Sequence, residues 1–324
     1  MAVTLPSAAC RDRSARFAAR TAALPGAVPQ DNRRPMHVPL RHDGVSLHAF
    51  LAAAHPHLSQ EMWQQRAGEG LLWLNNKVVT DLGVTVRAGN TVVHVIRNDV
   101  EPWVNTGVAF LYEDDALAVV SKPAPLAVHP CGRYNRNSLL PLLVHAFGET
   151  FWRPVHRLDV DTTGLMVLAK TATAARHLGQ QFERRDVRKL YLARVHGVPA
   201  VPRFTCELPL GDRPGQAGKR HTESEALGLP AHTQFEWIHT DGSQSVVTAN
   251  PHSGRTNQIR VHLAALGLPI VGDHAYSGDE EFTTGQQPLC LHAWTLAFAH
   301  PDDGRAMAFE DEAPAWAREP QAQR

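Results

Sequence analysis

A cluster of charged side chains stands directly before an apolar run near the middle of the chain. Residues 154–170 read PVHRLDVDTTGLMVLAK, and Asp159 follows Arg157 by two positions. The run over residues 165–169 is too short to cross a membrane and has the length of a buried strand. Residues 162–164, Thr-Thr-Gly, are typical of a turn. A carboxylate at the edge of a core needs a cation and hydrogen bonds to stay ionised, so Asp159 is either a structural ion-pair partner or a reactive group.

Two further polar residues occur in elements that otherwise have simple packing patterns. Residues 189–195 alternate like a strand and place Tyr191 on a face shared with small and branched apolar side chains. Residues 255–264 have helical spacing, which leaves Arg260 off the apolar face. A strand tyrosine is commonly a core residue, and an arginine on an amphipathic helix is commonly solvated. Their occurrence in the same chain as Asp159 favours a functional cluster.

The overall charge is balanced, but its distribution along the chain is not. The 324 residues include 32 Lys+Arg and 32 Asp+Glu, so the net charge indicates no polyanionic partner. Residues 153–194 nevertheless hold nine cations against four acids, whereas residues 301–324 hold six acids against three arginines. A local excess of cations is typical of a face that contacts phosphates, although a solvated helix surface has the same composition.

Cysteine and histidine spacing indicates neither a metal site nor a disulfide framework. The four cysteines are far apart, form no CxxC pair and fit a reducing compartment. The nineteen histidines include no HExxH or comparable ligand spacing. No apolar stretch is long enough for a transmembrane helix, and no signal-peptide core occurs. We therefore expect no bound metal and no membrane association. The cysteines are Cys10, Cys131, Cys206 and Cys290.

The length suggests about two domains. Residues 1–36 are rich in Ala, Arg and Pro, which predicts a disordered basic arm. An organellar transit peptide or an RNA-contacting tail has a similar composition. Residues 37–98 combine two helical patterns with short strands and resemble the S-four-like RNA-binding domain named after a ribosomal protein, with fewer cations on its helices than is usual there. Residues 99–107 are predicted to be a linker.

Residues 108–312 are predicted to form one further domain, followed by a tail over residues 313–324. Residues 211–232, rich in Gly, Pro and charge, predict a loop or an irregular hairpin. The patterns predict strands at residues 110–112, 116–120, 165–169, 189–195, 246–249, 289–293 and 296–298, and helices beginning near 138, over 174–182 and over 259–266.

Five segments of this region together resemble the RluA family of RNA pseudouridine synthases. Together these segments run through nearly all of residues 108–301. Two strings within them, HRLDxxTTG and GRTxQIRxHLxxxGxPIxGD, are long, ordered and specific. The resemblance implies an α+β catalytic domain, with a mixed, mainly antiparallel sheet flanked by helices, behind a small α/β RNA-binding module. The segments are FLYEDDALAVVSKPAPLAVHP (110–130), PVHRLDVDTTGLMVLAKT (154–171), RKLYLARVHG (188–197), SGRTNQIRVHLAALGLPIVGDHAY (253–276) and LCLHAWTLAFAHP (289–301).

The resemblance also implies roles for individual residues. Asp159 is implied to be the catalytic aspartate, and Tyr191 to contact the target uracil. Arg260 is implied to pair with Asp159 and keep it ionised, as a bidentate arginine does. Arg157 is implied to enter the RNA stack where the target base leaves it. Further RNA contacts are expected from His156, Arg255, Gln258, His129 and Arg133.

Uridine isomerisation fits these residue types. The glycosidic bond must break, the base must turn, and a bond to carbon must form, which requires the base to leave the RNA helix. A planar arginine can fill the gap. The aspartate must be ionised whether it attacks covalently or removes a sugar proton, and both routes stay open. No metal or organic cofactor is required.

Four positions depart from residues common in the family, and none coincides with Asp159, Tyr191 or Arg260. We expect them to affect loop shape and substrate choice without touching the three reacting residues. The departures are Ser121, Pro125, Ser253 and Asn257.

The sequence therefore predicts site-specific conversion of uridine to pseudouridine in structured RNA. Ribosomal RNA of the 23S type is slightly favoured over transfer RNA because of the S-four-like module. A non-catalytic RNA-binding or ribosome-assembly factor on the same fold is the main alternative, and a carboxylate-dependent hydrolase, with Asp161 as its second acid, is a weaker one. We expect a monomer in the cytoplasm, with organellar import through residues 1–36 as the other option.

Overall fold

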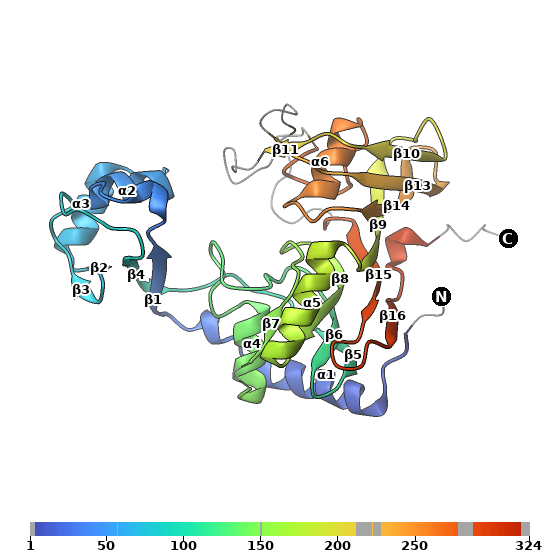
Figure 1. Ribbon diagram of the computed structural model, residues 1–324, viewed down its shortest axis with the longest axis horizontal. Coiled ribbons are helices and arrows are strands. Elements are labelled where there is room, and N and C mark those ends of the chain that lie inside the picture. Colours follow the sequence, from blue (N-terminus) through green and yellow to red (C-terminus); the bar gives the residue numbers. More distant parts are fainter. Residues whose placement is uncertain are drawn as a thin grey trace. The chain divides into compact units, whose positions relative to one another are not determined.

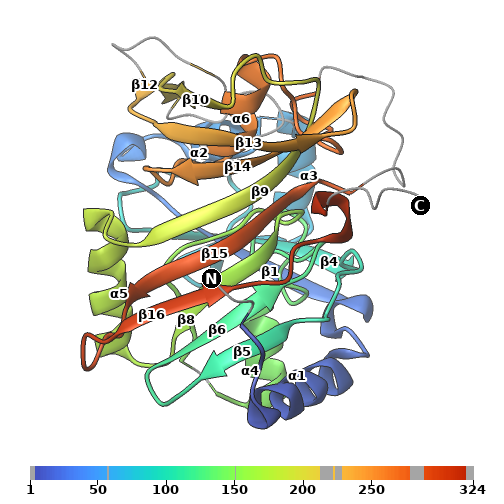
Figure 2. The same cartoon turned by 90° about the vertical axis from the view of Figure 1, so that its right-hand side faces the viewer.

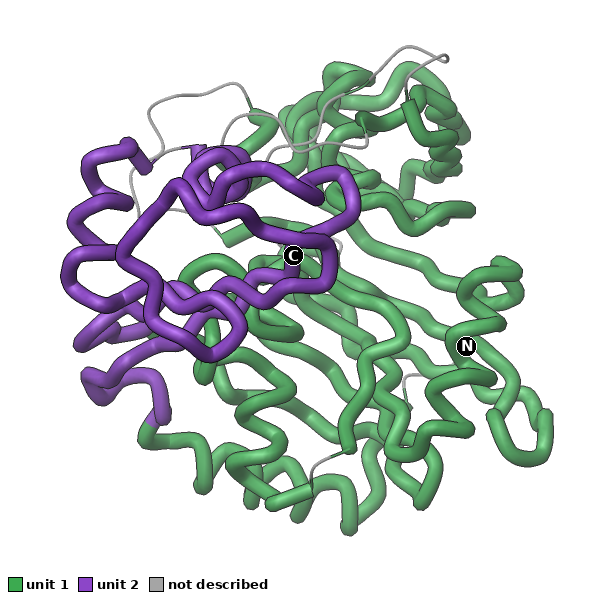
Figure 3. The backbone as a smooth tube through the Cα atoms, turned by 60° about the vertical axis from the view of Figure 1, so that its left-hand side comes forward, with its two compact units in different colours: residues 1–23, 103–324 green, residues 24–102 purple. Residues whose placement is uncertain are grey.

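The computed structural model describes residues 4–56, 58–149, 151–211, 222, 228–277 and 288–318. The chain divides into two compact units (Figure 3). Residues 24–102 form the smaller unit, and residues 1–23 join residues 103–324 in the larger one. Across the described ranges, no helix is both long and apolar enough to span a bilayer.

The smaller unit packs two helices on a four-stranded sheet. Ser46 and Ser59 cap the two helices by accepting hydrogen bonds from the backbone N–H three residues later. Leu47, Leu51 and Trp63 are fully buried between the helices and the sheet. The elements are α2 (Leu47–Ala54), α3 (Gln60–Gly68) and the sheet β1-β4-β2-β3, with β1 (Gln30–His37), β4 (Thr91–Asp99), β2 (Leu72–Leu74) and β3 (Lys77–Val78).

The predicted boundaries of this module were too narrow. β1 pairs with β4 antiparallel along most of its length, so residues 30–37 belong to the sheet. β4 also continues to Asp99, where the linker was expected to begin. The resemblance to the S-four-like domain stays a prediction.

The prediction of a disordered arm over residues 1–36 was wrong for most of that stretch. Residues Ala8–Thr21 form α1, which Ser7 caps. Phe17 is fully buried and packs 6.4 Å from the Phe110 ring and 6.1 Å from the Phe147 ring. The arginine-rich composition concealed one apolar face, and an average over the stretch cannot reveal a helix that is stabilised by distant partners.

The larger unit is built on one mixed, mainly antiparallel sheet, as predicted (Figure 1, Figure 2). Its order is β10-β13-β14-β9-β15-β8-β6-β5, with β16 beside β15 and β7 beside β8. The strands are β5 (Ala109–Glu113), β6 (Leu117–Lys122), β7 (Arg153–Pro154), β8 (Thr163–Ala169), β9 (Arg188–His196), β10 (Arg203–Cys206), β13 (Thr233–Thr240), β14 (Gln244–Pro251), β15 (Leu291–Ala299) and β16 (Ala306–Glu310). A separate pair joins β11 (Leu210–Gly211) to β12 (Gly228–Leu229).

Helices cover two parts of this sheet. The helices are α4 (Leu139–Phe147), α5 (Ala172–Arg184) and α6 (Gln258–Ala265). One core gathers β5, β6, β8 and α5 around residues such as Val119, Val167 and Leu178. Another gathers β9, β13, β14 and α6 around Val247 and Leu263. Each amphipathic face therefore closes over its own half of the sheet.

The two halves meet where β8 and β15 run parallel, and they pair there only through Thr163–His292 and Gly164–Ala293. Gly164 has a φ of +107°, and a Cβ built on it would lie 2.3 Å from the carbonyl oxygen of Ala293. Only glycine fits this approach. The junction directly follows the segment that carries Asp159.

Several boundaries differ from the sequence-based predictions. The two closing strands at residues 289–293 and 296–298 are the single strand β15, which has a bulge after Ala293. Residues 313–318 of the predicted tail are part of the larger unit, where Ala317 of the short helix η4 (Ala315–Ala317) packs on Leu192. Most of the predicted loop at residues 211–232 lies outside the described residues.

Candidate active site

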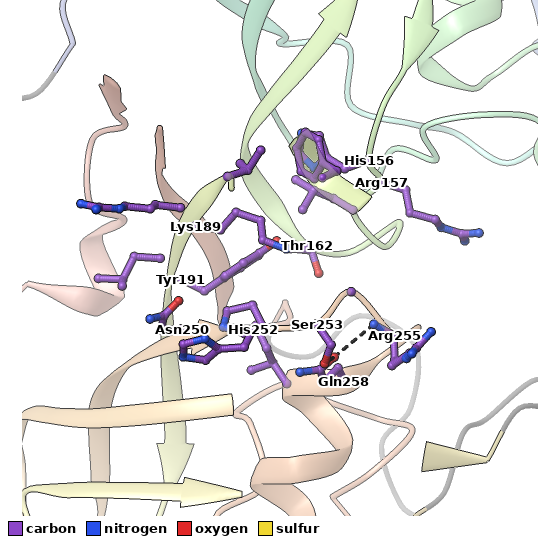
Figure 4. Close-up of a pocket in the computed structure, with 18 of the residues that line it drawn as sticks. His156, Arg157, Thr162, Lys189, Tyr191, Asn250, His252, Ser253, Arg255 and Gln258 are labelled. Atoms are coloured by element: carbon purple, nitrogen blue, oxygen red, sulfur yellow. Dashed lines mark hydrogen bonds between the residues drawn. The ribbon is translucent and has the colours of Figure 1, made fainter. Parts of the chain in front are cut away.

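A pocket of about 1030 Å³ opens beside β9 in the larger unit (Figure 4). Its walls come from the segment before β8, the C-terminal end of α5, β9, the end of β14 and the start of α6. The pocket brings together three residues from distant parts of the sequence: Asp159, Tyr191 and Arg260. These are the three predicted catalytic residues.

Asp159 sits in a tight turn that leads into β8. The N–H of Thr162 donates to the carbonyl of Asp159 at 3.2 Å, and the N–H of Leu126 donates to the carbonyl of Val160 at 2.9 Å. The Asp159 side chain remains 24% exposed. The backbone is therefore fixed while the carboxylate still reaches the pocket.

Lys122 stabilises this turn through hydrogen bonds to backbone carbonyls, a role that was not predicted from the sequence. The side chain is fully buried, and Nζ donates to the carbonyls of Pro123, Leu126 and Val160 at 2.9, 2.8 and 3.1 Å. Burial lowers the pKa of Lys122 to about 7, against the opposing charges of the nearby acids, of which Asp159 is one. The Lys-Pro dipeptide after a strand was the available signal.

Arg260 contacts Asp159, but its main partner is Asp273. Nε and Nη2 of Arg260 donate to the two oxygens of Asp273 at 2.8 and 2.7 Å. Nη1 donates to Oδ2 of Asp159 at 3.2 Å. The predicted ion pair is therefore present, whereas the bidentate geometry belongs to Asp273, whose side chain is fully buried. Burial alone would lower the pKa of Arg260, but the bonds and charges of Asp273 and then Asp159 raise it, so the guanidinium stays charged.

Two further residues, Tyr276 and Asn257, contact the Arg260 guanidinium. The guanidinium lies 5.1 Å from the centre of the Tyr276 ring. Asn257 accepts from Nη1 at 3.4 Å and donates to the Tyr276 hydroxyl at 2.9 Å. Asn257 was expected to touch none of the reacting residues, and this expectation was wrong, because its amide oxygen contacts Arg260 from a residue in the left-handed conformation (φ 58°).

Tyr191 projects from β9 into the pocket and is half-buried (Figure 4). Burial raises the pKa of its phenol, and the charge of Asp159 raises it further. Tyr191 is therefore a neutral, flat surface beside the carboxylate. Such a surface can contact a planar base without adding charge.

His156 and Gln258, both predicted RNA contacts, are engaged within the fold. Nε2 of His156 accepts from the N–H of Val167 at 3.1 Å, and its ring stacks 4.7 Å from Phe182. Gln258 is 4% exposed; its amide donates to Thr233 and its oxygen accepts from Ser253. A direct RNA contact by Gln258 would require these bonds to break, so the structure gives it the role of holding the loop.

The remaining predicted RNA contacts lie at the surface. Arg157 and Arg255 are exposed pocket residues, and both side chains extend to the same side of the close-up (Figure 4). Arg157 has no acidic partner among the residues that the structure describes, as expected if Asp159 pairs elsewhere. Burial and then the charge of Arg157 lower the pKa of His129, which places that loop near the arginine. Arg133 of the same loop is exposed, and neither it nor His129 lines the pocket.

Within the described residues, no group of three or more His, Cys, Asp or Glu side chains could hold a metal ion. The three predicted catalytic residues supply one carboxylate, one permanent cation and one neutral phenol to the pocket. This set can orient a base and offer an ionised oxygen to a sugar.

Known proteins share both the sequence and the fold. A family model described as RNA pseudouridylate synthase matches residues 116–265. An uncharacterized RNA pseudouridine synthase of Aquifex aeolicus (strain VF5) is 34% identical over 289 residues, covering 83% of this chain and 90% of the relative. The dual-specificity RNA pseudouridine synthase RluA of Escherichia coli (strain K12) is 36% identical over 217 residues, covering 65% of this chain and 93% of the relative.

A solved structure agrees with these relatives. Human RNA pseudouridylate synthase domain containing 1 superposes with a TM-score of 0.54 at 26% identity, covering 66% of this chain and 86% of that protein. The fold, the pocket and the relatives at this level of identity lead to one assignment. The chain belongs to the RluA family of RNA pseudouridine synthases.

Proposed function

We propose that this enzyme isomerises a specific uridine in structured RNA, with Asp159 as the reacting group. The observation that carries the proposal is the single contact from Arg260 to Oδ2 of Asp159 at 3.2 Å, in a residue that lines the pocket. An oxygen that is ionised and not hydrogen-bonded by the described residues is suited to attack a sugar carbon or remove a sugar proton.

The target base must leave the RNA helix before it can reach Asp159. A uracil that enters the pocket meets the face of Tyr191, whose neutral phenol supports the flipped base. Arg157 lies exposed at the side of the pocket and takes the vacated place in the stack. The free base can then turn and rejoin the sugar through carbon, with the pocket limiting its escape.

For the substrate, we propose ribosomal RNA of the large subunit, with transfer RNA as the second candidate. The ribosomal choice is supported by the resemblance of residues 37–98 to an S-four-like module. The relative RluA is named a dual-specificity RNA pseudouridine synthase, which is compatible with either class. We further propose that the protein acts as a cytoplasmic monomer.

Chemical mapping of pseudouridine in total RNA tests this proposal. Cells lacking the gene should lose the modification at one or a few positions, and the wild-type gene should restore it. A gene encoding Asp159→Asn should restore nothing. A map unchanged by deletion would refute the assignment. Restored growth or assembly by Asp159→Asn would instead support the non-catalytic role.

A further inference from the structure

Lys189 is a cation in the pocket wall without a partner that balances it. It precedes Tyr191 by two residues on β9, so both side chains leave the strand on the same face and enter the pocket (Figure 4). The ammonium lies 5.8 Å from the centre of the Phe182 ring. Over the described part of the chain, Nζ of Lys189 forms no hydrogen bond or ion pair.

The groups that face Lys189 do not supply an anion. Burial and then the charge of Lys189 lower the pKa of His156 to about 3, so that ring is neutral. The pKa of His252 is lowered by burial and by nearby cations, including Arg185 and Lys189. Glu183 also lines the pocket, yet it is exposed and makes no ion pair with Lys189. Burial without a counter-charge lowers the pKa of Lys189 itself.

The pocket therefore has two electrostatic parts. In one part, Arg260 pairs with Asp159, which lines the pocket, and with Asp273, which is fully buried and does not line it. In the other part, Lys189 lines the pocket with Arg185, which follows α5, and Arg188, which begins β9, and both arginines are exposed. A ligand that matches this pattern is neutral in the first part and anionic in the second.

We propose that Lys189 binds a phosphate oxygen of the nucleotide whose base enters the pocket. This inference rests on the proposed function. Two residues of an extended strand span about 7 Å, which is on the scale of the separation between a pyrimidine ring and the phosphates of its own nucleotide. A uracil against Tyr191 thus brings a phosphate to the ammonium. The phosphate supplies the anion that the protein lacks, and the half-buried position makes the bond stronger than one at a solvated lysine.

Tritium release from total RNA of cells lacking the gene, labelled with 5-tritiated uridine, tests the site. Lys189→Met keeps the side-chain stem and removes the charge. We expect kcat/KM to fall about ten- to hundredfold, mainly through KM. The plot of log kcat/KM against log salt concentration should also become less steep by about 1, as for the loss of one phosphate contact. Lys189→Arg should recover the salt dependence.

Arg176→Met is the matched control, because Arg176 is an exposed cation of α5 that does not line the pocket. It should change the salt dependence much less than Lys189→Met does. A wild-type salt dependence in Lys189→Met, or no recovery in Lys189→Arg, would overturn the phosphate site. If Lys189→Met fails to fold, the salt dependence of kcat/KM is measured on Lys189→Gln instead. A wild-type enzyme that releases no tritium from this RNA would refute the proposed function instead.

Discussion

The two carboxylates that bind Arg260, those of Asp159 and Asp273, do so with different numbers of hydrogen bonds. Asp273 receives two short hydrogen bonds, whereas Asp159 receives one longer bond. A bidentate pair fixes the plane of a guanidinium, so Asp273 determines where Nη1 points. Arg260 can therefore orient Asp159 without occupying both of its oxygens. Asp273 is best described as a positioning residue for the arginine.

Replacing Asp273 with Asn should show that the position of Arg260 depends on Asp273. The change removes one of the two charges that hold the buried end of Arg260, and we expect kcat to fall about tenfold or more through misplacement. The free energy of unfolding should fall by about 3 kcal/mol, because a buried pair is broken. Urea unfolding and tritium release measure both effects. Loss of stability with an unchanged kcat in the folded fraction would contradict the positioning role.

Asp159→Asn should abolish tritium release while RNA binding persists, since only the ionised oxygen is lost. Asp161→Asn is the control, because Asp161 stands two residues away and is exposed. It should retain activity close to wild type. Filter binding with total RNA from cells lacking the gene checks that affinity survives in both variants. Normal release by Asp159→Asn would remove the carboxylate from the mechanism.

His156 should make stability sensitive to acid. Burial, and then the charge of Lys189, lower the pKa of the folded ring to about 3, against about 6.5 in an unfolded chain. Between these values the unfolded state binds a proton that the folded state does not, so stability is complete above pH 6.5 and falls as the pH drops toward 3. The loss is on the order of 1 kcal/mol per pH unit.

His156→Gln removes the titrating ring and keeps an acceptor for Val167 N–H. Urea unfolding measures the free energy of unfolding between about pH 4.5 and about pH 7.5, a range that includes the pKa of an unfolded histidine. Plotted against pH, this free energy should change less steeply in His156→Gln than in wild type. His145→Gln, at an exposed position of α4, should keep the wild-type slope. Equal slopes in all three proteins would argue against the proposed contribution of His156.

At the residue scale, the sequence predicted the meeting of Asp159, Tyr191 and Arg260 because they lie in long, specific motifs. Asp273 lies in one of those motifs, and its role was still missed. The spacing of residues shows which elements they occupy, but it does not show how a guanidinium divides its bonds. Gln258 illustrates the same limit, because its amide turns inward to the loop.

At the element scale, the parallel contact of β8 with β15 is the most constrained feature. It rests on two residue pairs, and one of them requires a glycine, because an added Cβ would lie 2.3 Å from the backbone oxygen of Ala293. The turn with Asp159 enters β8 directly before this point. The position of the carboxylate therefore depends on how closely two strands from distant parts of the chain approach.

Gly164→Ala should lower the free energy of unfolding by at least about 3 kcal/mol, since it combines a clash with an unfavourable φ. Gly179→Ala is the control within α5, where an added Cβ meets nothing within 4 Å. That change should be neutral or stabilise by about 0.5–1 kcal/mol. Urea unfolding compares the two. Equal stability of both variants would show that the junction can relax.

Elements with local signals were predicted well, and elements that depend on distant partners were not. The start of α4 was predicted near residue 138, and the helix begins at Leu139, because its helical spacing lies within one short stretch. β1 was missed because it pairs with β4 at residues 91–99, far along the chain, so its own residues carry a weak pattern. α1 was missed for the same reason, because Phe17 finds its partners more than ninety residues later.

At the scale of the whole molecule, the smaller unit has a core of its own, and we expect residues 24–102 to fold alone. The fragment should unfold cooperatively in urea and give dispersed amide signals in an NMR spectrum. The fragment 37–98 is the sharper comparison, since it lacks β1 and leaves one edge of β4 unpaired. It should be unfolded or much less stable. Equal folding of both fragments would show that β1 is dispensable.

During synthesis, α1 is made well before the residues of the larger unit that cover its apolar face. The helix leaves the ribosome before the rings that cover Phe17, which follow at positions 110 and 147. At about 5–20 residues per second, the apolar face of α1 waits on the order of ten seconds for its second partner. Meanwhile the smaller unit can complete its own fold between the two parts of the larger one. The larger unit is therefore completed after the smaller one, and the apolar face of α1 stays exposed until its partners have been made.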